Sequence, residues 1–319
     1  MPHPISRRAF FGGAASAAFA ASTPARADGG AEAPAEPPIV HLDRLTNREV
    51  EERLKTCDAV FVPHGPVSGH GPWTTLGVHA HGAEAVSLLL ARKCGGFVYP
   101  TVTTAFAGAT RLYPGTVPFS YEFHVQVLKT VARSLCSQGF GRIFLVAYTN
   151  PEDAAGLIAA RDLFDIEGEL PVAALVATKG MSSDPVRALL ADYEGSAGEA
   201  IIDYAALRLL GRERPIAEPE LAKKGLKSGE DQNPEIREAI RTLRSHGTRG
   251  FRYDTEREHA SHGTVGLTYK GQPDLELGLK LLEAMADYHL PAVEALKAHR
   301  DYLRAHPARK IEKMDSLDK

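Results

Sequence analysis

Six histidines gather in two short stretches of this 319-residue chain, namely His64, His70, His79, His81, His259 and His262. Neutral imidazoles are common zinc ligands, and three of them with a water form a recognised single-zinc site. A glycine on each side of His70 keeps backbone bulk away from its ring. We therefore interpret His70 and His79 as candidate metal ligands, with the third ligand coming from His259 or His262. The alternative is that His64, His79 and His81 only pack or hydrogen-bond at a helix start.

A second candidate for chemistry is the adjacent pair Glu258-His259. A histidine beside an acid is suited to general acid/base catalysis near neutral pH. The alternative is a surface charge cluster, because Glu256, Arg257 and Glu258 form a run of charges.

Other residues of these segments are candidates to line a pocket. Trp73, the only tryptophan, either stacks on a planar substrate or forms a wall of the site. Tyr148, Thr149 and Glu152 follow a predicted strand and either line the pocket or begin the next helix. For Glu152 the helix start is favoured, because acids stabilise the first helical turn.

The elements that position these residues alternate between strands and helices. Apolar runs predict buried strands at 58–63, 97–102, 142–148 and 171–177, and amphipathic patterns predict helices at 47–55, 79–93, 120–137 and 152–164. We expect an α/β fold, a three-layer αβα sandwich with a largely parallel central sheet. A last helix is predicted from about residue 273 to about 304, with a break at Pro291. In such sheets the ligand lies beyond the carboxyl ends of the strands.

The first residues are typical of an export signal. Arg7-Arg8, preceded by Ser6 and followed by an Ala-rich apolar run and Ala25-Arg26-Ala27, resembles a twin-arginine leader. We predict a signal peptide over 1–27, a flexible lead-in over 28–38, one domain over 39–306 with a helical insertion around 185–247, and a charged tail over 307–319. The protein is therefore expected to be periplasmic or secreted, without a stable membrane anchor.

The composition excludes several classes of protein. With 44% hydrophobic and 24% charged residues the chain is globular, and its net charge of -3 gives no basic field for nucleic acid. Its three cysteines are irregularly spaced and do not predict a disulfide framework.

Several segments resemble the creatininase (creatinine amidohydrolase) family. The stretch 65–79 is similar, without a gap, to the family loop Gly-Ser-x-Glu-Gln-His-Gly-Pro-His-Leu-Pro-Leu-Gly-Thr-Asp. Residues 113–116 resemble its Phe-Pro-Gly-Thr, residues 258–261 its late His-Ala-Gly segment, and 271–273 fit the start of its last helix. The resemblance covers roughly 60–290 and implies a creatininase-like fold, with Glu258 and His259 as acid/base groups. It also implies a homo-oligomer, a hexamer.

The same resemblance shows departures at the metal ligands. The family's Glu is Ser68 here, its Asp is His79, its second ligand His falls on Thr149, and a following acid falls on Pro151. Only His70 is an unchanged ligand. Ser68 and Thr149 are poor ligands for two ions, so we expect at most one divalent transition metal, zinc first.

These observations lead to three hypotheses. The first is an exported creatininase-like hydrolase of a small polar carbonyl compound such as a cyclic amide, lactam or lactone. The second is a lyase or isomerase that uses the acid/base pair alone. The third is a non-catalytic protein that binds a small molecule. Fold alone does not decide among them, and metal content is the cheapest measurement that separates them.

Overall fold

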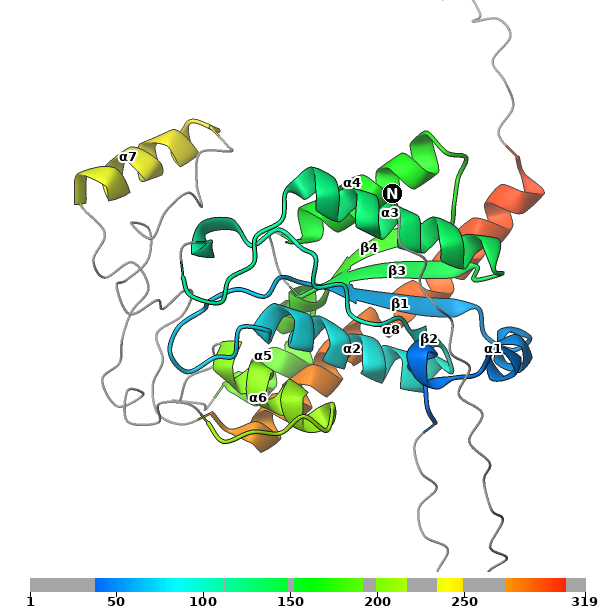
Figure 1. Cartoon of the computed structure of the whole chain (residues 1–319), viewed down its shortest axis with the longest axis horizontal. Helices are drawn as coiled ribbons and strands as arrows, with labels where there is room; N and C mark the ends of the chain where they lie inside the picture. The colour runs from blue at the N-terminus through cyan, green and yellow to red at the C-terminus, as the bar shows by residue number, and fades with distance from the viewer. Residues whose placement is uncertain are drawn as a thin grey trace, which may run out of the picture. The chain divides into compact units, whose positions relative to one another are not determined.

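A computed structural model describes residues 38–111, 113–148, 152–191, 199–216, 234–248 and 273–307. Strands and helices alternate through its first half (Figure 1), in the order η1 (Leu42–Arg44), α1 (Asn47–Leu54), β1 (Ala59–His64), α2 (Val78–Cys94), β2 (Phe97–Val98), η2 (Gly108–Thr110), α3 (Tyr121–Ser137), β3 (Arg142–Ala147), α4 (Glu152–Asp165) and β4 (Val172–Val176). The second half is helical, with η3 (Ala177–Ser182), α5 (Asp184–Leu190), α6 (Glu199–Leu209), α7 (Pro234–Ser245) and α8 (Leu275–Ala305).

The four described strands form one parallel sheet in the order β2-β1-β3-β4. Val60 pairs with Phe97 on one side of β1 and with Ile143 on the other, and Ile143 pairs in turn with Val172. Because the central strands are covered on both faces, they are apolar from Ala59 to Pro63 and from Ile143 to Ala147. The predicted parallel α/β sheet is confirmed.

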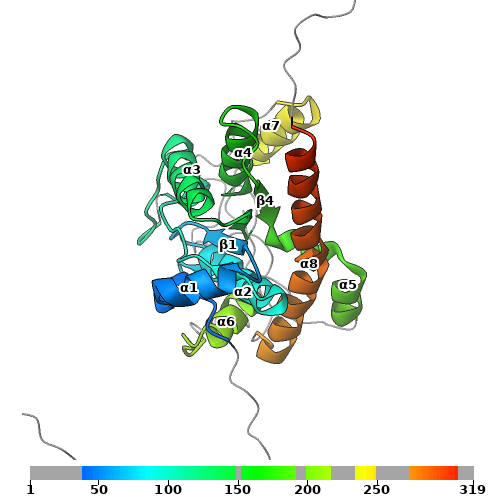
Figure 2. The ribbon, with the colours of Figure 1, turned by 90° about the vertical axis from the view of Figure 1, so that its right-hand side faces the viewer.

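Two hydrophobic clusters lie on the two faces of this sheet. Val60, Val62 and Ile143 face a cluster built with α3 and α4, whereas Phe61 and Phe144 face one built with α2, α6 and α8. Alternate residues of a strand point to opposite faces, so each strand contributes to both clusters. Figure 1 shows α3 and α4 on one side of the strands and α2 and α6 on the other, and Figure 2 shows α8 running beside the sheet.

The helix starts follow the local sequence. At Thr46 the side chain accepts a hydrogen bond from the backbone of Glu49, whose carboxylate accepts one from Thr46, so a full capping box begins α1. Ser120 caps α3 in the same manner through the backbone of Phe123. Asp274 caps α8 through the backbone of Leu277.

Two predicted boundaries are wrong. The helix α8 continues through Pro291 from Leu275 to Ala305, because Leu281, Met285 and Val293 anchor it in the core on both sides of the proline. The second strand ends at Val98 instead of Val102, since Pro100 has no N–H to donate to a ladder. Pairing resumes only as an isolated bridge between His64 and Val102. In the part of the chain that the structure describes, no helix combines the length and the apolar character needed to cross a membrane.

Candidate metal centre

The candidate residues Ser68, His70 and Tyr148 lie at the carboxyl end of the sheet, as predicted. Ser68 and His70 follow β1, and Tyr148 is the residue after β3. The loop after β1 is closed by a hydrogen bond of 2.8 Å from the Ser68 N–H to the Leu76 carbonyl. The Gly69 N–H donates to Thr116 Oγ1 at 3.0 Å, which joins this loop to the segment 113–116.

Three side chains from three segments converge there. His70 lies on the loop, His79 in the first turn of α2, and Glu199 is the first residue of α6. The distance from His70 Nδ1 to Glu199 Oε2 is 3.3 Å, and that from His79 Nε2 to Glu199 Oε1 is 3.5 Å. The ring centroids of His70 and His79 are 4.2 Å apart. One donor atom from each of the three residues lies within 4.8 Å of the other two.

This donor set fits a divalent transition metal. Zinc bonds of roughly 2.0–2.2 Å in a tetrahedron place neighbouring ligand atoms ~3.4 Å apart, close to the two distances above. Among the described residues, neither His70 Nδ1 nor Glu199 Oε2 has a hydrogen-bond partner, although both atoms are buried and face each other. Buried polar atoms without partners are costly, and an ion would satisfy them. Two imidazoles and one carboxylate are also the protein ligands of many catalytic zinc sites.

The surroundings of Glu199 keep its carboxyl group ionised, which is the form that binds a metal. Burial alone would raise the pKa of Glu199, but the nearby His70 and His79 outweigh burial and hold that pKa well below its usual range. Ser68 Oγ lies 3.0 Å from His70 Nε2 and both side chains are buried. If Ser68 Oγ accepts a hydrogen bond from the Nε2–H group, Nδ1 is left free to bind an ion. In metal-binding histidines the second ring nitrogen commonly donates such a hydrogen bond.

Tyr148 closes one side of the site. Its ring centroid lies 5.7 Å from that of His79, and its ring packs against Gly82 of α2, where a Cβ atom would come within 2.5 Å of Tyr148 Cδ2. A glycine inside a helix is thus required for this close contact. Burial, with the charges of Glu199 and Asp203, raises the pKa of Tyr148, so the phenol stays protonated.

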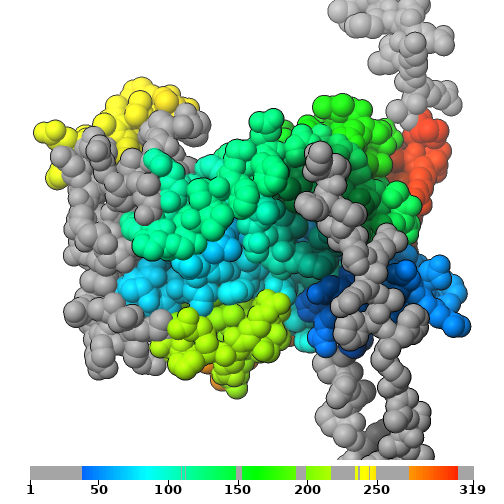
Figure 3. Space-filling view, in the orientation of Figure 1, coloured from blue at the N-terminus to red at the C-terminus, as the bar shows by residue number. Residues whose placement is uncertain are grey.

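A second histidine–carboxylate pair joins the same two helices. Asp203, one turn after Glu199 on α6, is fully buried. It accepts hydrogen bonds from the Thr75 N–H at 2.6 Å, from Thr75 Oγ1 at 2.9 Å and from His81 Nδ1 at 3.0 Å. His81 lies two residues after His79, so this pair fixes α6 against α2 beside the candidate ligands. Figure 3 shows α2 and α6 adjacent on one face of the molecule.

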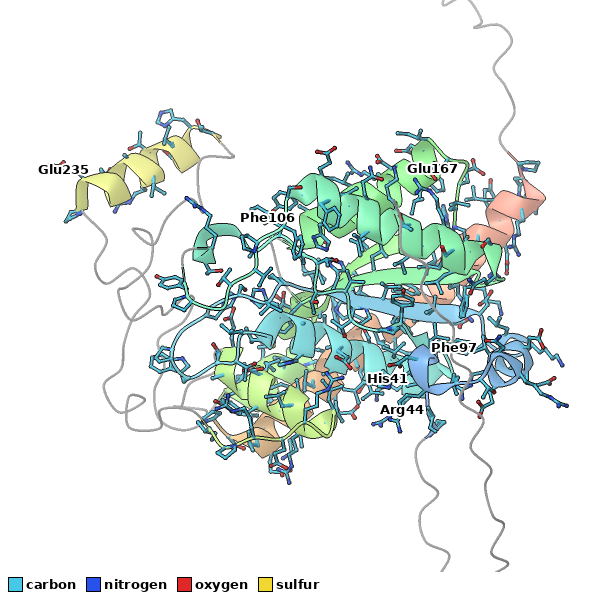
Figure 4. All side chains as sticks on the ribbon, viewed as in Figure 1. His41, Arg44, Phe97, Phe106, Glu167 and Glu235 are labelled. Atoms are coloured by element: carbon cyan, nitrogen blue, oxygen red, sulfur yellow. The ribbon has the colours of Figure 1, made fainter. Side chains whose placement is uncertain are left out.

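Glu84 of α2 binds the segment that follows α6. It is buried and accepts two hydrogen bonds from Arg212, at 2.7 and 2.8 Å, and one from Thr101 at 2.8 Å. His41, labelled in Figure 4, lies 3.5 Å from the same carboxylate. Burial would raise the pKa of Glu84, but the hydrogen bonds from His41, Arg212 and Thr101 lower it to about 2.

The predicted site residues have different outcomes. His70 and His79 lie together, with Ser68 and Tyr148 beside them, and Trp73 is buried in the loop after β1. Glu152 begins α4, in agreement with the interpretation that it starts a helix. The remaining candidates lie outside the described residues and stay predictions: Thr149, Glu258, His259 and His262. His64 and His81 follow the packing alternative, since His64 is buried edge-on against His124 at 5.0 Å and His81 binds Asp203.

Glu199 was not predicted from the sequence. It lies in the region interpreted as a helical insertion, yet α6 is a core helix whose residues 200–207 are all buried. Two acids four residues apart, within the largely apolar stretch 199–207, were the available signal, because acids are rarely buried without a partner.

Comparison with known proteins agrees with the sequence resemblance. Residues 43–182 match the Creatininase family model, described as creatinine amidohydrolase. A stretch of 111 residues is 27% identical to the 3-dehydro-scyllo-inosose hydrolase of Thermotoga maritima. That match covers 34% of this chain and only 36% of the relative.

Solved structures share the fold. A manganese creatininase superposes with a TM-score of 0.58 at 18% identity, covering 85% of this chain and all of the other. A putative creatinine amidohydrolase from Bacteroides fragilis gives 0.58 at 17% identity, covering 81% and 96%. At these identities the likeness establishes the fold.

Proposed function

We propose that the chain is a divergent member of the creatininase family and a hydrolase of a small polar carbonyl compound that uses one divalent metal ion. The observation that carries this proposal is the convergence of His70, His79 and Glu199. The relatives support it, since one is named a hydrolase and the solved structures include a manganese creatininase. Zinc and manganese are the ions to test first.

Each residue of the site has a definite task in this proposal. A divalent ion would supply a Lewis acid that polarises the substrate carbonyl. Ser68 holds the ring of His70 through the contact of 3.0 Å. Tyr148, kept protonated, is a hydrogen-bond donor beside His79. Glu258 and His259 are proposed to move protons, on the resemblance alone.

The proposed substrates are small cyclic carbonyl compounds: cyclic amides, lactams, lactones and ring ketones of polyols. The two relatives motivate this range, because their names give hydrolysis of creatinine and of 3-dehydro-scyllo-inosose. We place the enzyme in the periplasm or outside the cell on the strength of Arg7-Arg8 and the following leader pattern. A homo-oligomer is proposed from the family resemblance.

Ser68 supports a second candidate mechanism. The contacts from Ser68 Oγ to His70 Nε2, at 3.0 Å, and from His70 Nδ1 to Glu199 Oε2, at 3.3 Å, also resemble a nucleophile, base and orienting acid. In that case Ser68 would attack the carbonyl without a metal. We favour the metal because Nδ1 and Oε2 are not aligned as a hydrogen bond.

Metal retention tests the leading proposal. Protein loaded with zinc or manganese and then dialysed should keep about one ion per chain by elemental analysis. Glu199→Gln should weaken binding roughly 100-fold or more, because an amide is a poor replacement for a carboxylate ligand. Glu51→Gln, at an exposed position of α1, is the matched control and should bind as the wild type does. Two tightly held ions, or unchanged binding by Glu199→Gln, would contradict the proposal.

Ser68→Ala separates the two mechanisms. If Ser68 only supports His70, the metal-loaded variant should keep turnover while binding its ion about 10–100-fold more weakly. If Ser68 is the nucleophile, turnover should vanish at any metal concentration, and wild-type protein should be labelled at Ser68 by a fluorophosphonate. A tightly retained small molecule with no turnover of any candidate would assign the protein to the binding class.

A further inference from the structure

Two of the three cysteines lie just before two neighbouring strands, at the same spacing from a paired residue. Val60 of β1 pairs in parallel with Phe97 of β2, and Phe97 is labelled in Figure 4 at the end of the domain that carries α1. Cys57 lies three residues before Val60, and Cys94, the last residue of α2, lies three residues before Phe97. The two cysteines therefore precede neighbouring strands at the same level of the sheet.

Local contacts direct both sulfurs to the same place. Cys57 Sγ interacts with the backbone of Ala59, Cys94 Sγ with that of Gly96, and the two sulfurs with each other. Cys94 Sγ also lies 3.9 Å from the Ala91 carbonyl oxygen. A Cβ atom on Gly96 would lie 2.7 Å from the Ala59 carbonyl oxygen and 3.1 Å from Cys94 Sγ. Cys94 Sγ is thus packed over the short segment that begins with Cys57. The third cysteine, Cys136, is on α3 and packs with the cluster on the opposite face of the sheet.

The electrostatic surroundings favour a thiolate in this pair. The guanidinium of Arg142 donates a hydrogen bond to Cys57 Sγ at 3.5 Å. The hydrogen bond from Cys94 and the charge of Arg142 lower the pKa of Cys57, whereas burial raises the pKa of Cys136. Thiolates are the species that attack disulfides.

We propose that Cys57 and Cys94 are a redox-active pair that forms an intramolecular disulfide with a disulfide oxidant such as oxidised glutathione. A thiolate of the pair attacks one sulfur of the oxidant, whose disulfide breaks and releases one glutathione thiol. The second cysteine loses its proton and attacks the mixed disulfide, releasing the other glutathione. The oxidant takes up two electrons and two protons, and one sulfur–sulfur bond joins the two cysteines.

This bond would close a loop that contains all of β1 and α2, and with them His70 and His79. A cross-link restricts the unfolded chain more than the folded one, so it should raise the unfolding midpoint by roughly 5–10 °C. The inference rests on the strand register and the thiol contacts, and it is independent of the metal site.

Mass spectrometry of the full protein tests the proposal. Protein incubated with oxidised glutathione is quenched in acid, unfolded in urea and labelled with N-ethylmaleimide. Oxidised wild type should take one label, on Cys136, and should yield a Cys57–Cys94 linked peptide, whereas reduced protein takes three. Cys136→Ser, the matched control, should form the bond equally and take no label after oxidation. Cys57→Ser should not form it.

The proposal is overturned by any of three results. These are three labels on wild type after oxidation, a stable glutathione adduct without the linked peptide, or a linked peptide that includes Cys136. Wild-type protein alone gives this answer, so the test remains valid if a serine variant folds poorly.

Discussion

Removal of the Asp203 carboxylate should loosen the helix that carries Glu199. Asp203 is fully buried and accepts three hydrogen bonds, two of them from Thr75 and one from His81. These bonds join α6 to the loop after β1 and to α2, which carry His70 and His79. If they position Glu199, their loss should reduce both the stability of the fold and the affinity for metal.

The expected magnitude follows from the contacts. A hydrogen bond to a charged group contributes about 1.5–3 kcal/mol, and breaking a buried charged network costs about 3–5 kcal/mol because the bonds are not additive. Asp203→Ala should therefore lower the free energy of unfolding by about 3–5 kcal/mol. Asp203→Asn keeps one acceptor for the Thr75 N–H but presents an NH₂ group to Thr75 Oγ1 and His81. It should cost about 1–3 kcal/mol.

Urea unfolding and zinc competition with a chelator measure the two effects separately. We expect Asp203→Asn to remain folded and to bind zinc about 10–100-fold more weakly, the usual effect of removing support for a metal ligand. Glu276→Gln is the control, since Glu276 forms an exposed ion pair with Arg208 of α6, at 2.9 Å. Its stability should change by less than about 1 kcal/mol. If Asp203→Asn is less stable than the wild type but binds zinc equally tightly, the reasoning is refuted.

Three further outcomes are expected. In its native host the mature protein should begin at Asp28, and mature chains with an intact Met1 in mass spectrometry would contradict the predicted leader. With an identified substrate, His259→Ala should fold and lower the rate of the chemical step by about 10²–10⁴-fold, and His262→Ala should have a milder effect; nearly full activity of His259→Ala would rule out the acid/base role. Glu84→Gln should lose about 3 kcal/mol of stability at neutral pH, because the native pKa is held at about 2. Because folding lowers the pKa of this carboxyl group, the difference in stability between wild type and Glu84→Gln should shrink as the pH falls from about 4 towards 2. Equal stabilities of the two proteins at pH 7 would contradict this prediction.

The sheet and its order of elements could be predicted because each strand is built on a short apolar run and several helices begin at a capping residue. Thr46 and Ser120 cap their helices as expected. Pro291 did not break α8, since the packing of a long helix outweighs the loss of one backbone hydrogen bond. Local sequence gives no measure of that packing.

From the sequence, the proximity of site residues could be predicted only for residues that lie close together along the chain. His70 and His79 are nine positions apart on one loop and helix start, so their proximity follows from the chain itself. Glu199 is brought to them by the packing of α6 on α2, a contact between segments more than a hundred residues apart. No local pattern specifies such a contact, and a histidine near residue 260 was the more obvious third ligand.

The close packing of α6 on α8 bears on when the candidate metal site can be assembled. At Gly278 of α8 a Cβ atom would lie 2.6 Å from the Ala205 side chain and 2.7 Å from the Ile201 carbonyl oxygen, so the two helices touch through their backbones. His70 and His79 leave the ribosome early, but α6 acquires its full support only when α8, the last helix that the structure describes, has been made. Glu199 therefore takes its place only after the chain has been synthesised beyond α8. A chain truncated before α8 would carry both histidines without a firmly positioned Glu199.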